Sequence, residues 1–180
     1  MPGVIALLDS ASSARIEGLW DEMERRFGIR RGFPGGIPHV TFHLGDFDVE
    51  PGTATIVERV AAATRPFRLH SSGLGVFGGP APVVFVTVAR SPAAATLAER
   101  LDHEIQAAGY PPTAPYYGPE RWVPHITLAQ QNLDGADLGA LLAWLASQPL
   151  AWDLPISSLS IARETPTSAE ILATFPLGDG

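Results

Sequence analysis

The sequence contains no cysteine and no lysine, so all twelve of its basic residues are arginine. Without cysteine there is no disulfide framework, no thiol nucleophile and no thiolate metal site. Without lysine there is no amine to carry the nucleotidyl group of an ATP-dependent ligase, and no P-loop pattern is present. The sequence also shows no apolar run long enough to span a bilayer and no basic, cleavable leader. We therefore expect a cytoplasmic protein without membrane contact.

Acidic residues outnumber basic ones, and the 180 residues carry a formal net charge of -7. Long nucleic acids are bound through Lys and Arg side chains that neutralise successive phosphates, so this chain is not expected to bind long duplexes. A small or terminal phosphate remains a possible ligand, because Arg can bind phosphate in a bidentate geometry. With 46% hydrophobic residues, the chain can form one well-packed core or two small lobes that share one.

Hydrophobic periodicity predicts the same series of elements twice. A strand at residues 3–9 is followed by a helix ending at Gly28, a strand (38–44), a helix (53–64) and two strands (67–77 and 82–89). The series then recurs as a helix (91–109), a strand (122–129), a helix around residues 138–145 and strands at 151–163 and 169–177. No flexible linker separates the halves. We expect one α+β domain, residues 1–180, of two pseudo-symmetric lobes with a central cleft.

The two corresponding strands carry the same motif, Pro-His-aliphatic-Thr-apolar. It contains His39 and Thr41 in the first copy, and His125 and Thr127 in the second, 86 residues apart (125 − 39). Because side chains alternate along a strand, each motif is expected to bury an apolar face and to present its His and Thr on the other. His43 is expected on the His39 face. Such alternation needs no function, because it is also the pattern of a half-buried strand with one face in solvent.

Several kinds of site are excluded by the residues around these motifs. The two imidazoles of "HVTFH" would lie roughly 13 Å apart on a strand, and no Asp or Glu falls within three residues of His125, so no metal or other cofactor is expected. There is no Gly-x-Ser-x-Gly elbow for a serine nucleophile. Two imidazoles with a pKa near ~6.5 can, however, share acid and base roles at neutral pH in a displacement at phosphorus. Two threonine hydroxyls can donate to the non-bridging phosphate oxygens.

The paired motifs, each preceded by proline and set in similar elements, resemble the H-x-T-x motifs of the 2H phosphoesterase superfamily. This superfamily includes 2′-5′ RNA ligase-like proteins and cyclic phosphodiesterases. The resemblance implies two antiparallel sheets flanked by helices, no required metal, and 2′,3′-cyclic phosphates of RNA ends or small nucleotides as substrates. It also implies that His125 activates water, His39 protonates the leaving oxygen, and Thr41 and Thr127 bind the phosphate. The chain departs from the family at Gln130, because many members carry Arg shortly after the second motif.

Further residues are candidates for substrate binding. The arginines of "RRFGIRR" precede the first motif, and although they also fit a solvated helix end, they can reach a phosphate. Two tyrosines of the Pro-rich loop before the second motif are candidates for stacking on a base. The substrate-binding candidates are His43, Arg30, Arg31, Tyr116, Tyr117 and Gln130. We expect a monomer that acts on a small cyclic-phosphate nucleotide or an RNA terminus. The alternative is a non-catalytic module of the same fold that binds a nucleotide or an RNA end.

Overall fold

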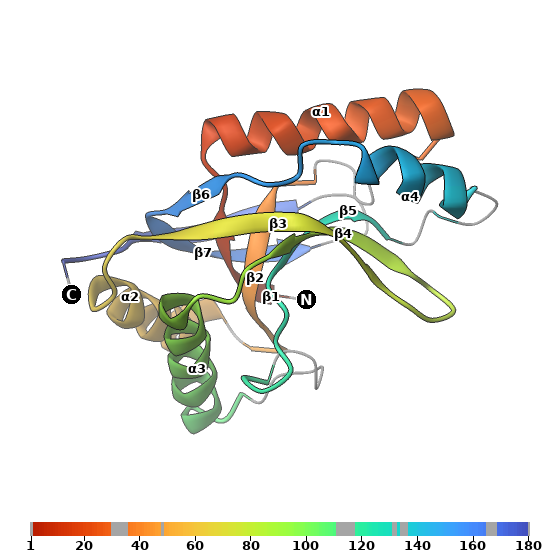
Figure 1. The fold of residues 1–180 in the computed structure, drawn as a ribbon. Coiled ribbons are helices and arrows are strands. Elements are labelled where there is room, and N and C mark those ends of the chain that lie inside the picture. Colours follow the sequence, from red (N-terminus) through yellow and green to blue (C-terminus); the bar gives the residue numbers. More distant parts are fainter. Residues whose placement is uncertain are drawn as a thin grey trace.

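The computed structural model describes residues 2–29, 36–47, 49–110, 118–130, 133, 137–164 and 169–179 (Figure 1). The strands are β1 (Pro2–Leu7), β2 (His39–Leu44), β3 (Phe67–Phe77), β4 (Val83–Val88), β5 (His125–Ala129), β6 (Asp153–Ile156), β7 (Ser158–Glu164) and β8 (Ala169–Pro176). The helices are α1 (Ser10–Phe27), α2 (Ala54–Ala62), α3 (Pro92–Ala107) and α4 (Leu138–Ala146), and a π-helical segment, η1 (Val49–Thr53), leads into α2.

The strands form two four-stranded antiparallel sheets, which confirms the α+β class and the two-lobed duplication. Their strand orders are β2-β1-β7-β8 and β5-β4-β3-β6. In each sheet the motif strand lies at the edge, paired with the strand that precedes it across one helix: β1 and α1 before β2, and β4 and α3 before β5. The two edge strands β2 and β5 contact each other. Both motifs therefore lie where the two sheets meet.

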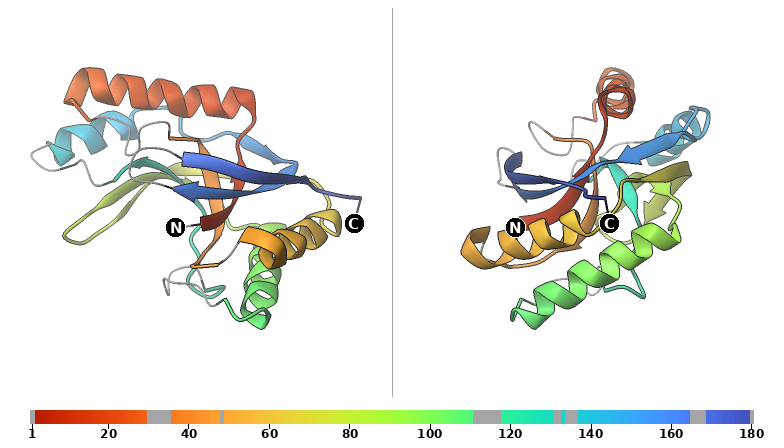
Figure 2. Two further views of the ribbon diagram at one scale, coloured as in Figure 1. Left: turned by 180° about the vertical axis from the view of Figure 1, so that it is seen from behind. Right: turned by 90° about the vertical axis from the view of Figure 1, so that its left-hand side faces the viewer.

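The helices cover the sheets from two sides. Figures 1 and 2 show α1 and α4 on one side of the strands and α2 and α3 on the other. Asp9 caps the N-terminus of α1, where its carboxylate accepts from the Ser12 amide, and Gly28 caps the C-terminus, where its φ of 66° suits a residue without Cβ. The rings of Phe27 and Trp144, 5.7 Å apart, join α1 to α4. Among the described parts of the chain, no helix is both long and apolar enough to cross a membrane.

The single strand expected at residues 151–163 is instead two strands in different sheets. β6 pairs with β3 in the second sheet, whereas β7 pairs with β1 and β8 in the first. The buried positions change parity between the two strands: Leu154 and Ile156 are buried in β6, and Leu159 and Ile161 in β7. At Ser157 the chain crosses from one sheet to the other, so the lobes are not contiguous in sequence.

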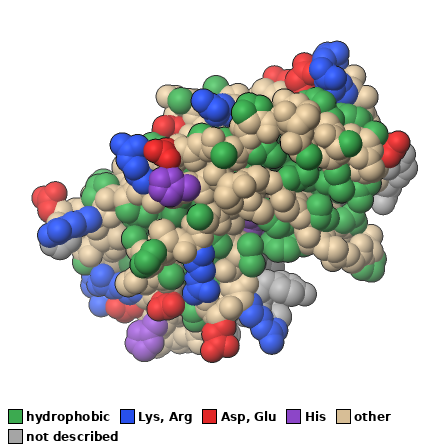
Figure 3. All heavy atoms as spheres, in the orientation of Figure 1, with side chains coloured by type: hydrophobic (Ala, Val, Ile, Leu, Met, Phe, Trp, Pro, Cys, Tyr) green, Lys and Arg blue, Asp and Glu red, His purple; other side chains and the backbone are tan. Residues whose placement is uncertain are grey.

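One apolar core joins the two lobes. Val40 and Phe42 of β2 and Ile126 and Leu128 of β5 are almost fully buried in it, as the motif pattern predicts. In the space-filling view of Figure 3, apolar side chains also gather on the surface at the right, between α4 and the β3–β4 hairpin. Among the described residues, the exposed large hydrophobic side chains include Phe77 at the end of β3.

Candidate active site

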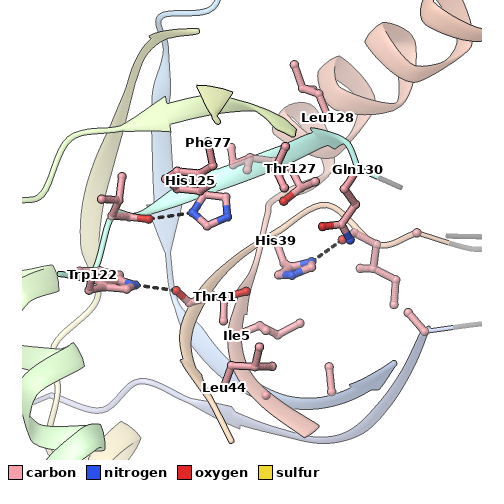
Figure 4. A pocket seen from close by; sticks show the side chains of 18 of the residues that line it. Ile5, His39, Thr41, Leu44, Phe77, Trp122, His125, Thr127, Leu128 and Gln130 are labelled. Carbon is pink, nitrogen blue, oxygen red and sulfur yellow. Dashed lines mark hydrogen bonds between the residues drawn. The ribbon is translucent and has the colours of Figure 1, made fainter. Parts of the chain in front are cut away.

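The two motif histidines line one cavity and are held in the same way. Nδ1 of His39 lies 2.6 Å from the carbonyl oxygen of Ile37, and Nδ1 of His125 lies 2.7 Å from that of Val123. A carbonyl oxygen only accepts hydrogen bonds, so Nδ1 carries a proton in each ring and Nε2 is the nitrogen that can exchange one. Figure 4 shows both rings directed into the cavity from β2 and β5.

A β-bulge follows the threonine of each motif. Phe42 is the extra residue of β2 in its register against β1, and Leu128, in the same place of the second motif, is the extra residue of β5 against β4. A bulge puts two residues opposite one, so the side chains beyond it lie on the opposite faces from those that simple alternation predicts. The duplication therefore includes an irregularity that alternation alone does not reveal.

The prediction that His43 shares the face of His39 is wrong, because the bulge lies between them. Beyond it, His43 turns into the core, where its side chain is fully buried. Its ring centroid is 5.9 Å from that of Phe47, and its Nδ1 is 3.8 Å from Oδ1 of Asp102 on α3. Leu44 lines the cavity in its place.

The matching bulge in β5 brings Gln130 into the cavity. Simple alternation would direct it away from the His125 face, but beyond Leu128 the faces are reversed and Gln130 lines the cavity (Figure 4). Ala129, buried in the core, takes the place that His43 has in β2. The neutral amide of Gln130 thus occupies a position at which the family resemblance predicts an arginine.

Two buried tryptophan side chains bond the backbone of the motif strands. Nε1 of Trp122 donates to the carbonyl of Thr41 at 2.9 Å, and Nε1 of Trp20 on α1 donates to that of Leu128 at 3.0 Å. Trp122 precedes β5 whereas Thr41 belongs to β2, so the first bond joins the two lobes. Each indole satisfies a backbone carbonyl beside a bulge, in a place with little access to water.

We expect Trp122→Phe to lower the free energy of unfolding by about 1–3 kcal/mol, because it leaves the Thr41 carbonyl without its donor in a buried place. Urea denaturation measures the change. Trp144→Phe is the matched control, because the Trp144 indole lies half-buried between α1 and α4, away from the cavity. An equal loss of stability in both variants would show that the hydrogen bond across the lobes contributes nothing.

Aromatic rings surround the imidazole of His125. Phe77 contacts it edge-on, with centroids 5.1 Å apart and an interplanar angle of 88°, and Phe85 contacts it at 5.0 Å. The two phenyl centroids are 4.2 Å apart. Gly75 on β3 makes room for this arrangement, because a Cβ at that position would collide with the Phe85 ring. We call Gly75, Phe77 and Phe85 the aromatic cradle.

The surroundings of His125 lower its pKa below the usual value. Burial is the largest cause, because it penalises the charged imidazolium. The hydrogen bond to the Val123 carbonyl opposes this effect, and the charge of His39 adds to it. His125 is therefore neutral at pH 7, with a lone pair on Nε2.

The cavity has a volume of about 680 Å³, within the range of sites for ligands of nucleotide size. Its described lining contains no Asp or Glu, and Arg121 is its only arginine. Within the described residues, no three His, Asp or Glu side chains are grouped so that they could hold a metal ion. Besides the two motifs, the lining includes Ile5, Leu44, Val76, Phe77, Val83, Val123, Arg121 and Gln130.

The structure brings together five of the predicted site residues: His39, Thr41, His125, Thr127 and Gln130. The predictions for Arg30, Arg31, Tyr116 and Tyr117 lie outside the described residues. Sequence reasoning missed the aromatic cradle. Alternation along the strand at 82–89 predicts that Phe85 and Val83 share one face of that strand. It does not predict which face of the strand lies beside His125.

The duplicated lobes and their paired His-x-Thr strands place this protein in the class of two-histidine phosphoesterase folds. The family model of the 2′-5′ RNA ligase superfamily matches residues 9–166, so the chain belongs to that superfamily of 2H phosphoesterases. The resemblance carried by the two motifs is thereby confirmed. A search of curated proteins finds no match to the chain.

Solved structures share the fold over nearly the whole chain. TT0787 of Thermus thermophilus has a TM-score of 0.69 at 20% identity, with 99% of each chain covered. Escherichia coli LigT complexed with 3′-AMP has a TM-score of 0.63 at 14% identity, covering 99% of this chain and 98% of LigT. Kluyveromyces marxianus Usb1 with uridine monophosphate has a TM-score of 0.52 at 15% identity, with 98% of each chain covered.

Proposed function

We propose that this protein is a metal-independent phosphodiesterase that hydrolyses a 2′,3′-cyclic phosphate, at an RNA end or in a small nucleotide, by two-histidine acid–base catalysis. The observation that carries the proposal is the matched anchoring of Nδ1 of His39 and of His125 to a backbone carbonyl, which makes Nε2 the proton-exchanging nitrogen of each ring in one cavity. Membership of the superfamily supports phosphoesterase activity in general. LigT was solved with 3′-AMP, the kind of product that opening of a 2′,3′-cyclic phosphate yields.

In the proposed reaction, a water oxygen attacks phosphorus while Nε2 of neutral His125 takes the water proton. The bond between phosphorus and one ribose oxygen breaks, and that oxygen receives the proton from Nε2 of His39. The hydroxyls of Thr41 and Thr127 donate to the non-bridging oxygens, where charge accumulates. The lowered pKa of His125 supports its assignment as the base. The product carries a 2′- or 3′-phosphate, and the leaving ribose oxygen has become a hydroxyl. Proton exchange with solvent restores both histidines.

Turnover of the four nucleoside 2′,3′-cyclic monophosphates, and of a short RNA ending in a cyclic phosphate, tests this function. Products separated by chromatography show whether the 2′- or the 3′-phosphate forms. We expect at least one of these substrates to be opened with EDTA present. Saturable binding of all of them without turnover would instead support the non-catalytic nucleotide-binding module.

The pH dependence of kcat/KM is expected to follow a bell with its maximum between roughly pH 5.5 and 8. The rate falls on the acid side as His125 becomes protonated, and because the pKa of His125 is lowered, this limb lies below the usual pKa of 6.5. On the alkaline side the rate falls as His39 loses the proton that it must donate. Rates measured across this range, with and without EDTA, give the profile.

The chelator is expected to leave the bell unchanged, because imidazole carries both proton transfers. A metal-activated water would instead lose its activity with EDTA and regain it with added zinc or manganese. That second result would contradict the two-histidine scheme.

A further inference from the structure

Arg121 contributes a positive charge at the mouth of the cavity. Its side chain lines the cavity yet is exposed to solvent, as is that of Val123 two residues later. Within the described residues its guanidinium has no ion pair, and no carboxylate lines the cavity beside it. The protein has a net charge of -7, so the positive charge of Arg121 at the cavity is opposite in sign to the net charge of the chain. An unpaired cation at a ligand site favours an anionic part of the ligand.

The turn that carries Arg121 is held in place from several sides. The amides of Arg121 and Trp122 both donate to the carbonyl of Gly118, at 2.9 and 3.0 Å. Nη2 of Arg90 donates to the carbonyl of Pro119 at 2.6 Å. The Trp122 indole adds the bond to β2 described above. The backbone of Arg121 is therefore already held in place relative to both motifs. Because it need not be ordered when an anion binds, the entropic cost of binding is lower.

Because Arg121 is exposed, the anion that it binds is expected to be a different group from the phosphate that reacts. The four motif side chains are half-buried within the cavity, whereas Arg121 lies at its rim. If the cyclic phosphate of a ligand lies between His39 and His125, the part of the ligand that contacts Arg121 is the part that extends toward solvent. In a nucleoside 2′,3′-cyclic phosphate, the 2′ and 3′ oxygens are both taken up in the ring. The 5′ oxygen is then the ribose oxygen left to carry a second phosphate.

We propose that Arg121 binds a second phosphate, at the 5′ position of a nucleoside 2′,3′-cyclic phosphate, and that the enzyme selects substrates that carry it. This inference rests on the function proposed above. The second phosphate is either a free 5′-phosphate or the phosphodiester that links the last nucleotide of an RNA to the preceding one. Both place an anion at the same ribose oxygen, and a guanidinium binds either one with charge-assisted hydrogen bonds.

The test compares kcat/KM for 2′,3′-cyclic AMP, its 5′-phosphorylated form, and the dinucleotide ApA ending in a 2′,3′-cyclic phosphate. In the wild type we expect at least one of the two substrates with a second phosphate to be preferred over 2′,3′-cyclic AMP on the order of tenfold. Which one is preferred identifies the source of that phosphate. Arg121→Gln should bring the ratio close to one. Raised salt should also weaken the preference, because the guanidinium is exposed.

Arg68→Gln is the matched control, because Arg68 is an exposed arginine of β3 outside the cavity lining. It should keep both the activity and the preference of the wild type. Three results would overturn the inference: no preference in the wild type, a preference that survives Arg121→Gln, or an equal loss on all substrates. The last would mean that Arg121 binds the reacting phosphate.

Binding measurements separate this inference from the proposed function. If no substrate is turned over, the proposed hydrolysis fails, and calorimetry with 3′-AMP and adenosine 3′,5′-bisphosphate then tests Arg121 directly. Tighter binding of the bisphosphate on the order of tenfold, lost in Arg121→Gln, would support the second phosphate site. Equal affinity for both nucleotides would reject it.

Discussion

Alanine at either motif histidine is expected to lower kcat for the best substrate by about 10²–10⁴-fold, the usual contribution of a positioned acid or base. In the proposed reaction, His39→Ala removes the proton donor for the leaving oxygen, and His125→Ala removes the acceptor for the water proton. Because both protons move in one displacement, the double variant should lose much less than the product of the two single losses. Steady-state kinetics on each variant measures these effects.

His103→Ala is the matched control, because His103 lies exposed on α3 outside the cavity lining. It should turn over substrate as the wild type does. Circular dichroism and urea denaturation on all variants show whether the fold is retained. Near wild-type turnover in His39→Ala or His125→Ala would remove that histidine from the mechanism.

Phe85→Ala is expected to lower the free energy of unfolding by about 3–5 kcal/mol, the usual cost of deleting a buried phenyl ring. Phe85 is 4% exposed and contacts both Phe77 and His125. The substitution should also change the pH profile. Burial is the main cause of the lowered pKa of His125, so opening the aromatic cradle to water should raise that pKa toward 6.5. The acid limb of the kcat/KM profile should then move to higher pH.

Val86→Ala separates the two effects, because Val86 is fully buried on the other face of β4 and is not part of the cavity lining. It should also lose stability, but its acid limb should coincide with that of the wild type. A shift of the same size in both variants would tie the pH profile to global stability and not to the aromatic cradle.

Much of the fold could be predicted from local patterns. The strand at 38–44 and the helix at 91–109 correspond to β2 and α3 with small differences at their ends, and Ser91 caps α3 by accepting from the Ala94 amide. These elements follow from hydrophobic periodicity and capping residues, which act over a few neighbouring positions. The segment at 151–163 was predicted incorrectly because its two halves are both extended, and they differ only in the sheet to which they bond.

The sequence by itself determined the duplication, the order of elements, the motif pair His39 and His125 with their threonines, and the superfamily. All of these depend on residue types at short or regular spacings. Only the tertiary structure decided that both motif strands are sheet edges, that a bulge after each threonine directs His43 inward and Gln130 into the cavity, and that Phe85 lies against His125. The physical reason is that a bulge or a ring contact depends on the register between strands far apart in the chain, which alternation within one strand does not specify.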